Sequence, residues 1–182
     1  MIAVTIRGVA TTEAGFVVLL QAEGEAEGKV LPIAIGGAEA QAILFELNGR
    51  EFPRPLTHDL FRSVLTELGA TLAKIEVNEL REETFFATLH LDTHKGRIEV
   101  DSRPSDALAL ALRCEAAIYV AEEVMAKAGV VLDKEGRTAR PADEEPKDPL
   151  RQLKAQLERA IAEERYEVAA RLRDRLRELS DQ

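Results

Sequence analysis

The first third of the chain alternates between short apolar runs and polar breaks. The runs I-A-V-T-I-R-G-V at 2–9, F-V-V-L-L-Q at 16–21 and V-L-P-I-A-I at 30–35 are rich in β-branched residues. Gly- and Glu-rich segments separate them, such as E-G-E-A-E-G at 23–28. Short apolar runs bounded by turn residues are typical of strands, so we expect three strands here.

The pattern then changes to the spacing of amphipathic helices. The first helix is expected at 38–47 and stops at Asn48-Gly49. The second is expected to begin at Thr57, a favourable N-cap residue, and to end at Gly69. The apolar positions at helical spacing are Ala40, Ile43, Leu44 and Leu47 in the first helix and Leu60, Val64, Leu65 and Leu68 in the second.

Three further strands are expected at 71–80, 84–91 and 96–101, and the short polar breaks between them predict consecutive antiparallel hairpins. An apolar helix follows to about residue 114. A short strand at 117–120 and a short helix at 122–128 complete this part of the chain. The pattern therefore predicts an α+β domain over 1–132, with a mixed, mainly antiparallel sheet and packed helices.

The composition changes after this domain. Residues 133–149 hold three prolines and almost no apolar side chains, which predicts a linker. Residues 150–182 consist almost entirely of helix formers, and their apolar stripe changes phase near 163–166. We expect an antiparallel helical hairpin whose small core needs a partner, either another protein or a second copy of the chain.

Bulk composition limits the class of protein. The chain has 182 residues, 46% hydrophobic and 31% charged, and Cys114 is its only cysteine. It has no apolar run near the roughly 18–20 residues that span a bilayer and no signal-peptide pattern at the N-terminus, so we expect a cytoplasmic protein without a membrane segment. The formal charge of −9 argues against a protein that only binds nucleic acid, but less against a metal-dependent nuclease.

The segment E-V-D-S-R-P-S-D at 99–106 leads into the apolar run A-L-A-L-A-L. One interpretation is helix initiation, with Asp101 or Ser102 as the cap, Pro104 in the first turn and Asp106 at the positive end of the helix dipole. The other is a site, where carboxylates and Arg103 surround backbone N–H groups that suit a phosphate or a metal–phosphate pair. Spacing alone favours helix initiation.

A second polar cluster, T-H-D-L at 57–60, also opens a helix, and Glu39 lies in the first turn of a third. His58 could transfer protons, although a lone histidine is more often a surface residue. His90 alternates with two leucines and is expected to face solvent. The histidines and Cys114 lack the spacing of a zinc site, and the sequence contains no phosphate-binding loop or nucleophile elbow.

Several motifs in order resemble the bifunctional nuclease domain family over about residues 1–130. They are L-P-I-A-I-G-G-A-E-A-Q-A-I, R-P-L-T-H-D-L-F, T-F-F-A-T-L and V-D-S-R-P-S-D-A-L-A-L-A-L-R followed by I-Y-V-A-E-E-V. The resemblance implies a compact α+β domain and nuclease activity on RNA and DNA. Its polar motifs fall on Glu39, His58, Asp59, Asp101, Arg103, Ser105 and Asp106. Glu83, where Gly or Asn is expected, and Phe86, where Tyr is expected, depart from the pattern.

The C-terminal segment A-I-A-E-E-R-Y-E-V-A-A-R-L-R-D-R-L resembles a UVR motif, the helical hairpin of excinuclease subunits B and C. That resemblance covers about residues 148–180 and implies a protein partner or self-association through residues 150–180. Arginines in the hairpin could also contact phosphates, but interleaved acids favour the protein partner.

The leading hypothesis is a nuclease that cleaves DNA or RNA with the help of Mg²⁺ or Mn²⁺. His58 would transfer protons and Arg103 would stabilise charge on the phosphate. The catalytic candidates are His58, Asp59, Asp101, Arg103, Ser105 and Asp106, and the candidate metal ligands are Glu39, Asp59 and Asp106, with Asp101 as a substitute for Glu39.

The alternative hypothesis is a regulatory or adaptor protein without catalysis. In that case the polar residues at 101–106 form a structural network and the hairpin recruits a partner. Acids that line an open groove would favour the nuclease, whereas an arginine paired in a closed interior would favour the adaptor.

Overall fold

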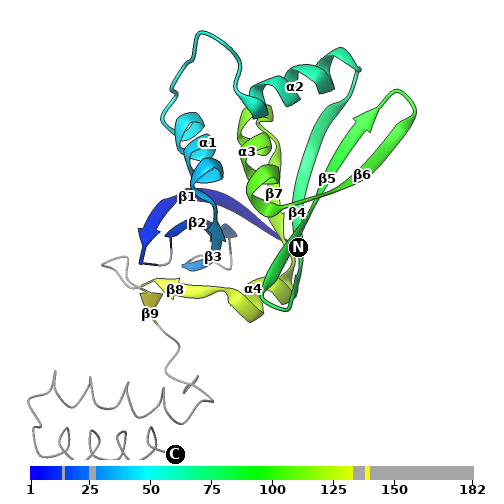
Figure 1. Ribbon diagram of the computed structural model, residues 1–182. Coiled ribbons are helices and arrows are strands. Elements are labelled where there is room, and N and C mark those ends of the chain that lie inside the picture. Colours follow the sequence, from blue (N-terminus) through cyan, green and yellow to red (C-terminus); the bar gives the residue numbers. More distant parts are fainter. Residues whose placement is uncertain (14, 25–27, 133–137, 140–182) are drawn as a thin grey trace, which may run out of the picture. The chain divides into compact units, whose positions relative to one another are not determined.

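Figure 1 shows the computed structural model of the chain, which describes residues 1–13, 15–24, 28–132 and 138–139. Residues 1–139 form one compact unit. The predicted hairpin at 150–182 and most of the predicted linker lie outside the described residues.

The described strands join in one nine-stranded sheet with the order β6-β5-β4-β7-β1-β2-β3-β8-β9. Every neighbouring pair is antiparallel except β4 and β7, which are parallel. The strands are β1 (Ile2–Thr12), β2 (Gly15–Ala22), β3 (Lys29–Ile35), β4 (Thr71–Arg81), β5 (Thr84–Thr93), β6 (Gly96–Ser102), β7 (Ala117–Val120), β8 (Val130–Leu132) and β9 (Thr138–Ala139). The predicted α+β class with a mainly antiparallel sheet is confirmed.

The helices of the described part are α1 (Gly37–Leu47), α2 (Thr57–Glu67), α3 (Pro104–Cys114) and α4 (Glu122–Ala128). The α3 helix packs against α1, α2 and β4, and Figure 1 shows it between α1 and β4. Its residues 107–111 are at most 2% exposed, because small alanines between leucines let neighbouring elements approach it from several sides. Within the described part of the chain, no helix has the length and hydropathy needed to cross a membrane.

Two predicted helix caps are wrong by one or two residues. Leu56, not Thr57, is the N-cap of α2, and its backbone N–H donates to the Asp59 carboxylate over 2.8 Å. Arg103, not Asp101 or Ser102, is the N-cap of α3. In α2 the Asp59 carboxylate accepts the backbone N–H of the cap residue itself, which holds the start of the helix although Leu56 has no polar side chain. The prediction that Pro104 occupies the first turn is confirmed.

The prediction that His90 faces solvent is also wrong, because His90 is only 7% exposed. The strand alternation is correct, since His90 lies opposite Glu99 on β6 while its neighbours Leu89 and Leu91 are in the core. However, Glu76 on β4 approaches to 3.0 Å from His90 Nε2, and Glu99 lies 3.5 Å from Nδ1. Side chains of adjacent strands therefore close over a residue that alternation alone assigns to the surface.

Candidate functional site

Arg103 joins the first turns of two helices. Its Nη2 lies 2.9 Å from Glu39 Oε1 in α1, and its Nε donates to Asp106 Oδ2 in α3 over 2.7 Å. The Arg103 side chain is 66% exposed, whereas Glu39 is 18% exposed. Arg103 therefore lies across the N-terminal ends of α1 and α3 at the protein surface, and its guanidinium is accessible to solvent.

His58, from the first turn of α2, adds a third helix to this group. Its Nε2 lies 3.5 Å from Asp106 Oδ1, and its side chain is 16% exposed. The two oxygens of Asp106 thus face different partners, Oδ1 towards His58 and Oδ2 towards Arg103. We call Glu39, His58, Arg103 and Asp106 the Arg103 cluster.

The Arg103 cluster is held together by opposite charges. The hydrogen bond to Asp106, and then the one to Glu39, raise the pKa of the Arg103 guanidinium, so it stays protonated. One cation faces two carboxylates, and the cluster is therefore not strongly positive. A phosphate would meet the three N–H groups of Arg103 that neither contact uses.

Asp59 lies outside this cluster. Its carboxylate accepts hydrogen bonds from Arg113 Nε and from the Leu56 backbone N–H. Partial burial acts to raise the pKa of Asp59, but the Leu56 N–H and the Arg113 guanidinium outweigh it and hold the pKa below its ordinary value. Asp59 is thus a fixed carboxylate that anchors the start of α2 to the last turn of α3.

Arg113 is the polar residue that the sequence did not single out. It is 5% exposed and donates to the carbonyl oxygens of Ala109 and Ala42 over 2.8 and 3.2 Å. Asp59 and these two carbonyls satisfy a guanidinium whose burial would otherwise be costly. The available signal was a single arginine directly after six apolar residues of α3, where a solvent-exposed position is unexpected.

Asp101 and Ser105 are near the cluster in sequence but have different surroundings. Asp101 is exposed on β6 opposite Thr88, and Ser105 is 7% exposed in the first turn of α3. Among the side-chain contacts of the described residues, neither forms a hydrogen bond or ion pair with Glu39, His58, Arg103 or Asp106. Of the seven predicted site residues, the structure brings four together.

The arrangement does not fit a preformed divalent-metal site. Glu39 and Asp106 both direct a carboxylate oxygen at Arg103, so the guanidinium occupies the place between them that a cation would need. Among the described residues, no group of three or more histidine, cysteine, aspartate or glutamate side chains is arranged to hold a metal ion. Mg²⁺ and Mn²⁺ favour several oxygen ligands at about 2 Å, and here those oxygens already have a partner.

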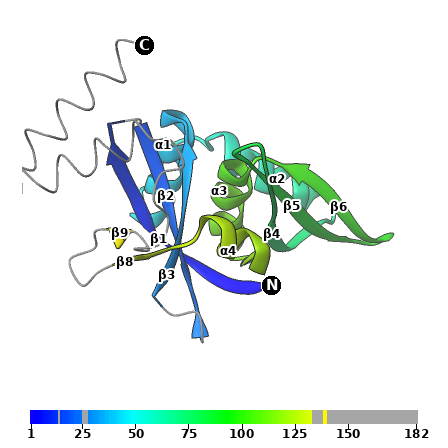
Figure 2. The same ribbon diagram turned by 90° about the horizontal axis from the view of Figure 1, so that it is seen from below.

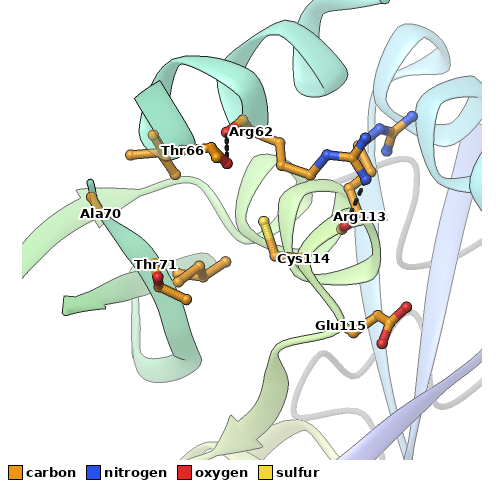
Figure 3. Close-up of a pocket in the computed structure, with 9 residues that line it drawn as sticks. Arg62, Thr66, Ala70, Thr71, Arg113, Cys114 and Glu115 are labelled. Atoms are coloured by element: carbon orange, nitrogen blue, oxygen red, sulfur yellow. Dashed lines mark hydrogen bonds between the residues drawn. The ribbon is translucent and has the colours of Figure 1, made fainter. Parts of the chain in front are cut away.

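A cavity of about 300 Å³ lies elsewhere, between α2, the end of α3 and the start of β4. Figure 3 shows Arg62, Thr66, Thr71 and Cys114 around it. Arg62 Nη1 donates to the Arg113 carbonyl oxygen over 3.0 Å, and burial raises the pKa of the Cys114 thiol. No member of the Arg103 cluster lines this cavity, so the cavity does not supply the cluster with a binding pocket.

Residues 17–133 match the sequence model of the bifunctional nuclease domain. The chain belongs to the bifunctional nuclease domain family. This match spans α1, α2 and α3, and so includes every member of the Arg103 cluster. Residues 147–182 match the UvrB/uvrC motif, in the part of the chain that lies outside the described residues.

Individual proteins are also similar to this chain. An uncharacterised protein of Mycobacterium tuberculosis is 46% identical over 125 residues, which cover 66% of this chain and 74% of the relative. Bifunctional nuclease 1 of Arabidopsis thaliana is 25% identical over 168 residues, which cover 82% of this chain and 52% of the relative. Bifunctional nuclease 2 of Oryza sativa subsp. japonica is 26% identical over 94 residues, half of this chain and 29% of the relative.

Proposed function

We propose that this member of the bifunctional nuclease domain family hydrolyses phosphodiester bonds of DNA or RNA at the Arg103 cluster. The observation that carries the proposal is the convergence of Glu39, His58, Arg103 and Asp106 from the first turns of three helices. The family assignment and the names of the plant relatives support the same reaction class.

In this proposal Arg103 binds a non-bridging oxygen of the scissile phosphate and stabilises the negative charge that develops there. Its exposed guanidinium keeps free N–H donors for that task. His58 takes a proton from the attacking water or gives one to the leaving oxygen, and Asp106 orients its imidazole through Nε2. Glu39 holds the second side of the guanidinium and so positions Arg103.

Metal dependence is a separate expectation that the assay must test. None of the roles proposed for these residues requires a metal ion, because Arg103 lies between the carboxylates that would bind the metal. A divalent cation would need Arg103 to move away from Glu39 and Asp106. Activity that depends on Mg²⁺ or Mn²⁺ would therefore indicate a rearranged cluster.

The test is cleavage of labelled single- and double-stranded DNA and RNA by the full chain, with Mg²⁺, with Mn²⁺ and with chelator. We expect Asp106→Ala, His58→Ala and Arg103→Gln each to lower the cleavage rate about a hundredfold. Arg81→Gln is the matched control, because Arg81 makes a similar exposed pair with Glu79 on β4, outside the cluster. If Asp106→Ala cleaves as fast as the unaltered chain, the assignment of this site is wrong.

The adaptor alternative has one specific observation in its favour. Arg103 already has two carboxylate partners within its own chain, as expected for a structural network. Under this alternative the segment that matches the UvrB/uvrC motif recruits a partner protein. Folded protein that cleaves none of the four substrates in any of these conditions would favour the adaptor.

Three further expectations accompany the proposed nuclease activity. They are a cytoplasmic location, nucleic acid as substrate, and a protein partner or self-association through residues 150–180. The match to the UvrB/uvrC motif supports the third, and the family assignment supports the second.

A further inference from the structure

The β6 strand is a long, free edge of the sheet. It lies at one end of the strand order and pairs only with β5, through seven residue pairs without a register shift. Within the described residues, its outer backbone N–H and C=O groups therefore face no neighbouring strand. The opposite edge, β9, has only two residues. A regular exposed edge readily pairs with another strand unless something blocks it.

The face of β6 that points towards the helices is apolar. Ile98 and Val100 are 47% and 38% exposed, although they lie opposite Leu91 and Leu89 on β5, which are both 4% exposed. The apolar inner face of the sheet thus continues onto β6 without cover. Apolar residues on an uncovered edge strand are typical of a surface that a partner buries.

A second exposed apolar surface lies on α2, which Figures 1 and 2 both show next to the β5–β6 hairpin. Of the nine large apolar side chains that are exposed in the described part of the chain, five are on these two elements and a sixth is the C-cap of α2. They are Leu60, Phe61 and Val64 on α2, Leu68 at its C-cap, and Ile98 and Val100 on β6. One side of the molecule therefore carries most of its exposed large apolar residues.

The other face of β6 carries charges in a definite order. Arg97, after Lys95 in the turn, is followed by Glu99 and Asp101, so the strand is basic where it begins and acidic where it ends. A second β6 that runs antiparallel places its acidic half against the basic half of the first. A parallel copy would place like charges together, which is unfavourable. The charge order of β6 is thus complementary to itself in the antiparallel direction alone.

We propose that β6 pairs antiparallel with β6 of a second copy of this chain, extending the sheet across a two-fold axis while the α2 surfaces help to cover its apolar face. Such a contact is isologous, because both copies contribute the same surface to the interface. On one face Ile98 meets its own counterpart. On the other face Arg97, which also pairs with Asp92 of its own β5, meets Glu99 of the second copy. The contact is independent of the proposed nuclease activity and of residues 150–180.

The first test measures self-association of the full chain by sedimentation equilibrium over a range of concentrations. We expect a dimer of twice the chain mass of 20.1 kDa. Replacing both Ile98 and Val100 by Lys should raise the dimer dissociation constant about a hundredfold, since each change acts twice across the two-fold axis. Val131→Lys is the control, because Val131 is 48% exposed on β8, a strand distant from β6 in the sheet order.

Both side chains are already exposed, so the altered chain should unfold at the same urea concentration as the unaltered one when both are monomeric. An unaltered chain that stays monomeric overturns the proposal. So does a dimer whose dissociation constant is unchanged by the two lysines, because that dimer is held elsewhere, for example by residues 150–180.

The second test reverses charges and probes the direction of pairing. Arg97→Glu makes β6 acidic along its length and should weaken the dimer about tenfold. Adding Glu99→Arg restores a basic and an acidic position, and should return the dissociation constant to within a few-fold of its original value. A double variant as weak as Arg97→Glu alone would contradict antiparallel β6 pairing.

Discussion

His58 and Asp59 are adjacent in the sequence but contact opposite ends of α3. His58 faces Asp106 in the first turn, whereas Asp59 faces Arg113 in the last turn. Neighbouring residues of a helix point about 100° apart, which is enough to separate an open site from a half-buried ion pair. Of the two, only His58 lies where it could reach a substrate at the Arg103 cluster.

Replacing Asp59 by Asn should destabilise the fold rather than alter its chemistry. Arg113 would be left almost fully buried without its closest carboxylate, and we expect a loss of about 3 kcal/mol in the free energy of unfolding at pH 7. Urea unfolding followed by circular dichroism measures it. Glu79→Gln, which breaks an exposed pair with Arg81, should cost less than about 1 kcal/mol. Equal losses in the two variants would contradict the role given to Asp59.

The Asp59–Arg113 ion pair predicts that the free energy of unfolding depends on pH. The pKa of Asp59 is below its ordinary value of 3.8 in the folded protein, so the ionised carboxylate stabilises the fold at pH values above 3.8. This stabilisation is lost as the pH falls from that value through the lower folded pKa. The difference in unfolding free energy between the unaltered chain and Asp59→Asn should therefore narrow in this acidic range. A difference that stays constant down to the folded pKa would show that Asp59 does not titrate in this way.

At the scale of elements, the turn that joins β4 and β5 has an unfavourable amino-acid sequence. Its two connecting residues, Glu82 and Glu83, have φ values of 48° and 61°. Two left-handed residues between paired strands define a turn that favours Asn-Gly. Most side chains are strained there, whereas Gly has no Cβ and Asn can hydrogen-bond to its own backbone. The sequence comparison with the family pattern identified position 83 as unusual, and the backbone conformation gives the physical reason.

Replacing Glu82-Glu83 by Asn-Gly should raise the free energy of unfolding by about 2 kcal/mol, because the strain of two left-handed residues is relieved. Urea unfolding at pH 7 measures the gain. The control, Gln at both positions, removes the same two charges without easing the backbone. A similar gain in the control would assign the effect to charge repulsion instead.

At the scale of the whole molecule, residues 1–139 have their own core. The buried cluster draws on strands from both halves of the sheet and on all four described helices, from Val4 to Met125. A core of this extent is sufficient for a domain of ordinary size to fold.

We therefore expect a fragment of residues 1–139 to unfold in one cooperative step at the urea concentration that unfolds this domain in the full chain. Fluorescence is weak without tryptophan, so circular dichroism at a β-sheet wavelength is the appropriate signal. A fragment that is unfolded, or that unfolds at clearly lower urea, would show that the domain depends on the rest of the chain.

The local pattern of residues predicts the elements and their order, from the strand at 2–9 to the helix at 122–128. Strand alternation, helical spacing and turn residues are local signals. The described elements from β1 to α4 confirm them, whereas β8 and β9 lie beyond the predicted elements. The same local logic identified Glu39, His58, Arg103 and Asp106, because polar residues at the start of a helix are visible without knowing where that helix packs.

Which distant residues come into contact depends on the tertiary packing. It inserts β7 between β1 and β4, closes Glu76 and Glu99 over His90, and buries Arg113 against Asp59. It also separates Asp59 from the cluster that holds His58. These outcomes depend on how helices and strands far apart in the chain pack together, and the periodicity of one segment carries no information about the partner on its other side.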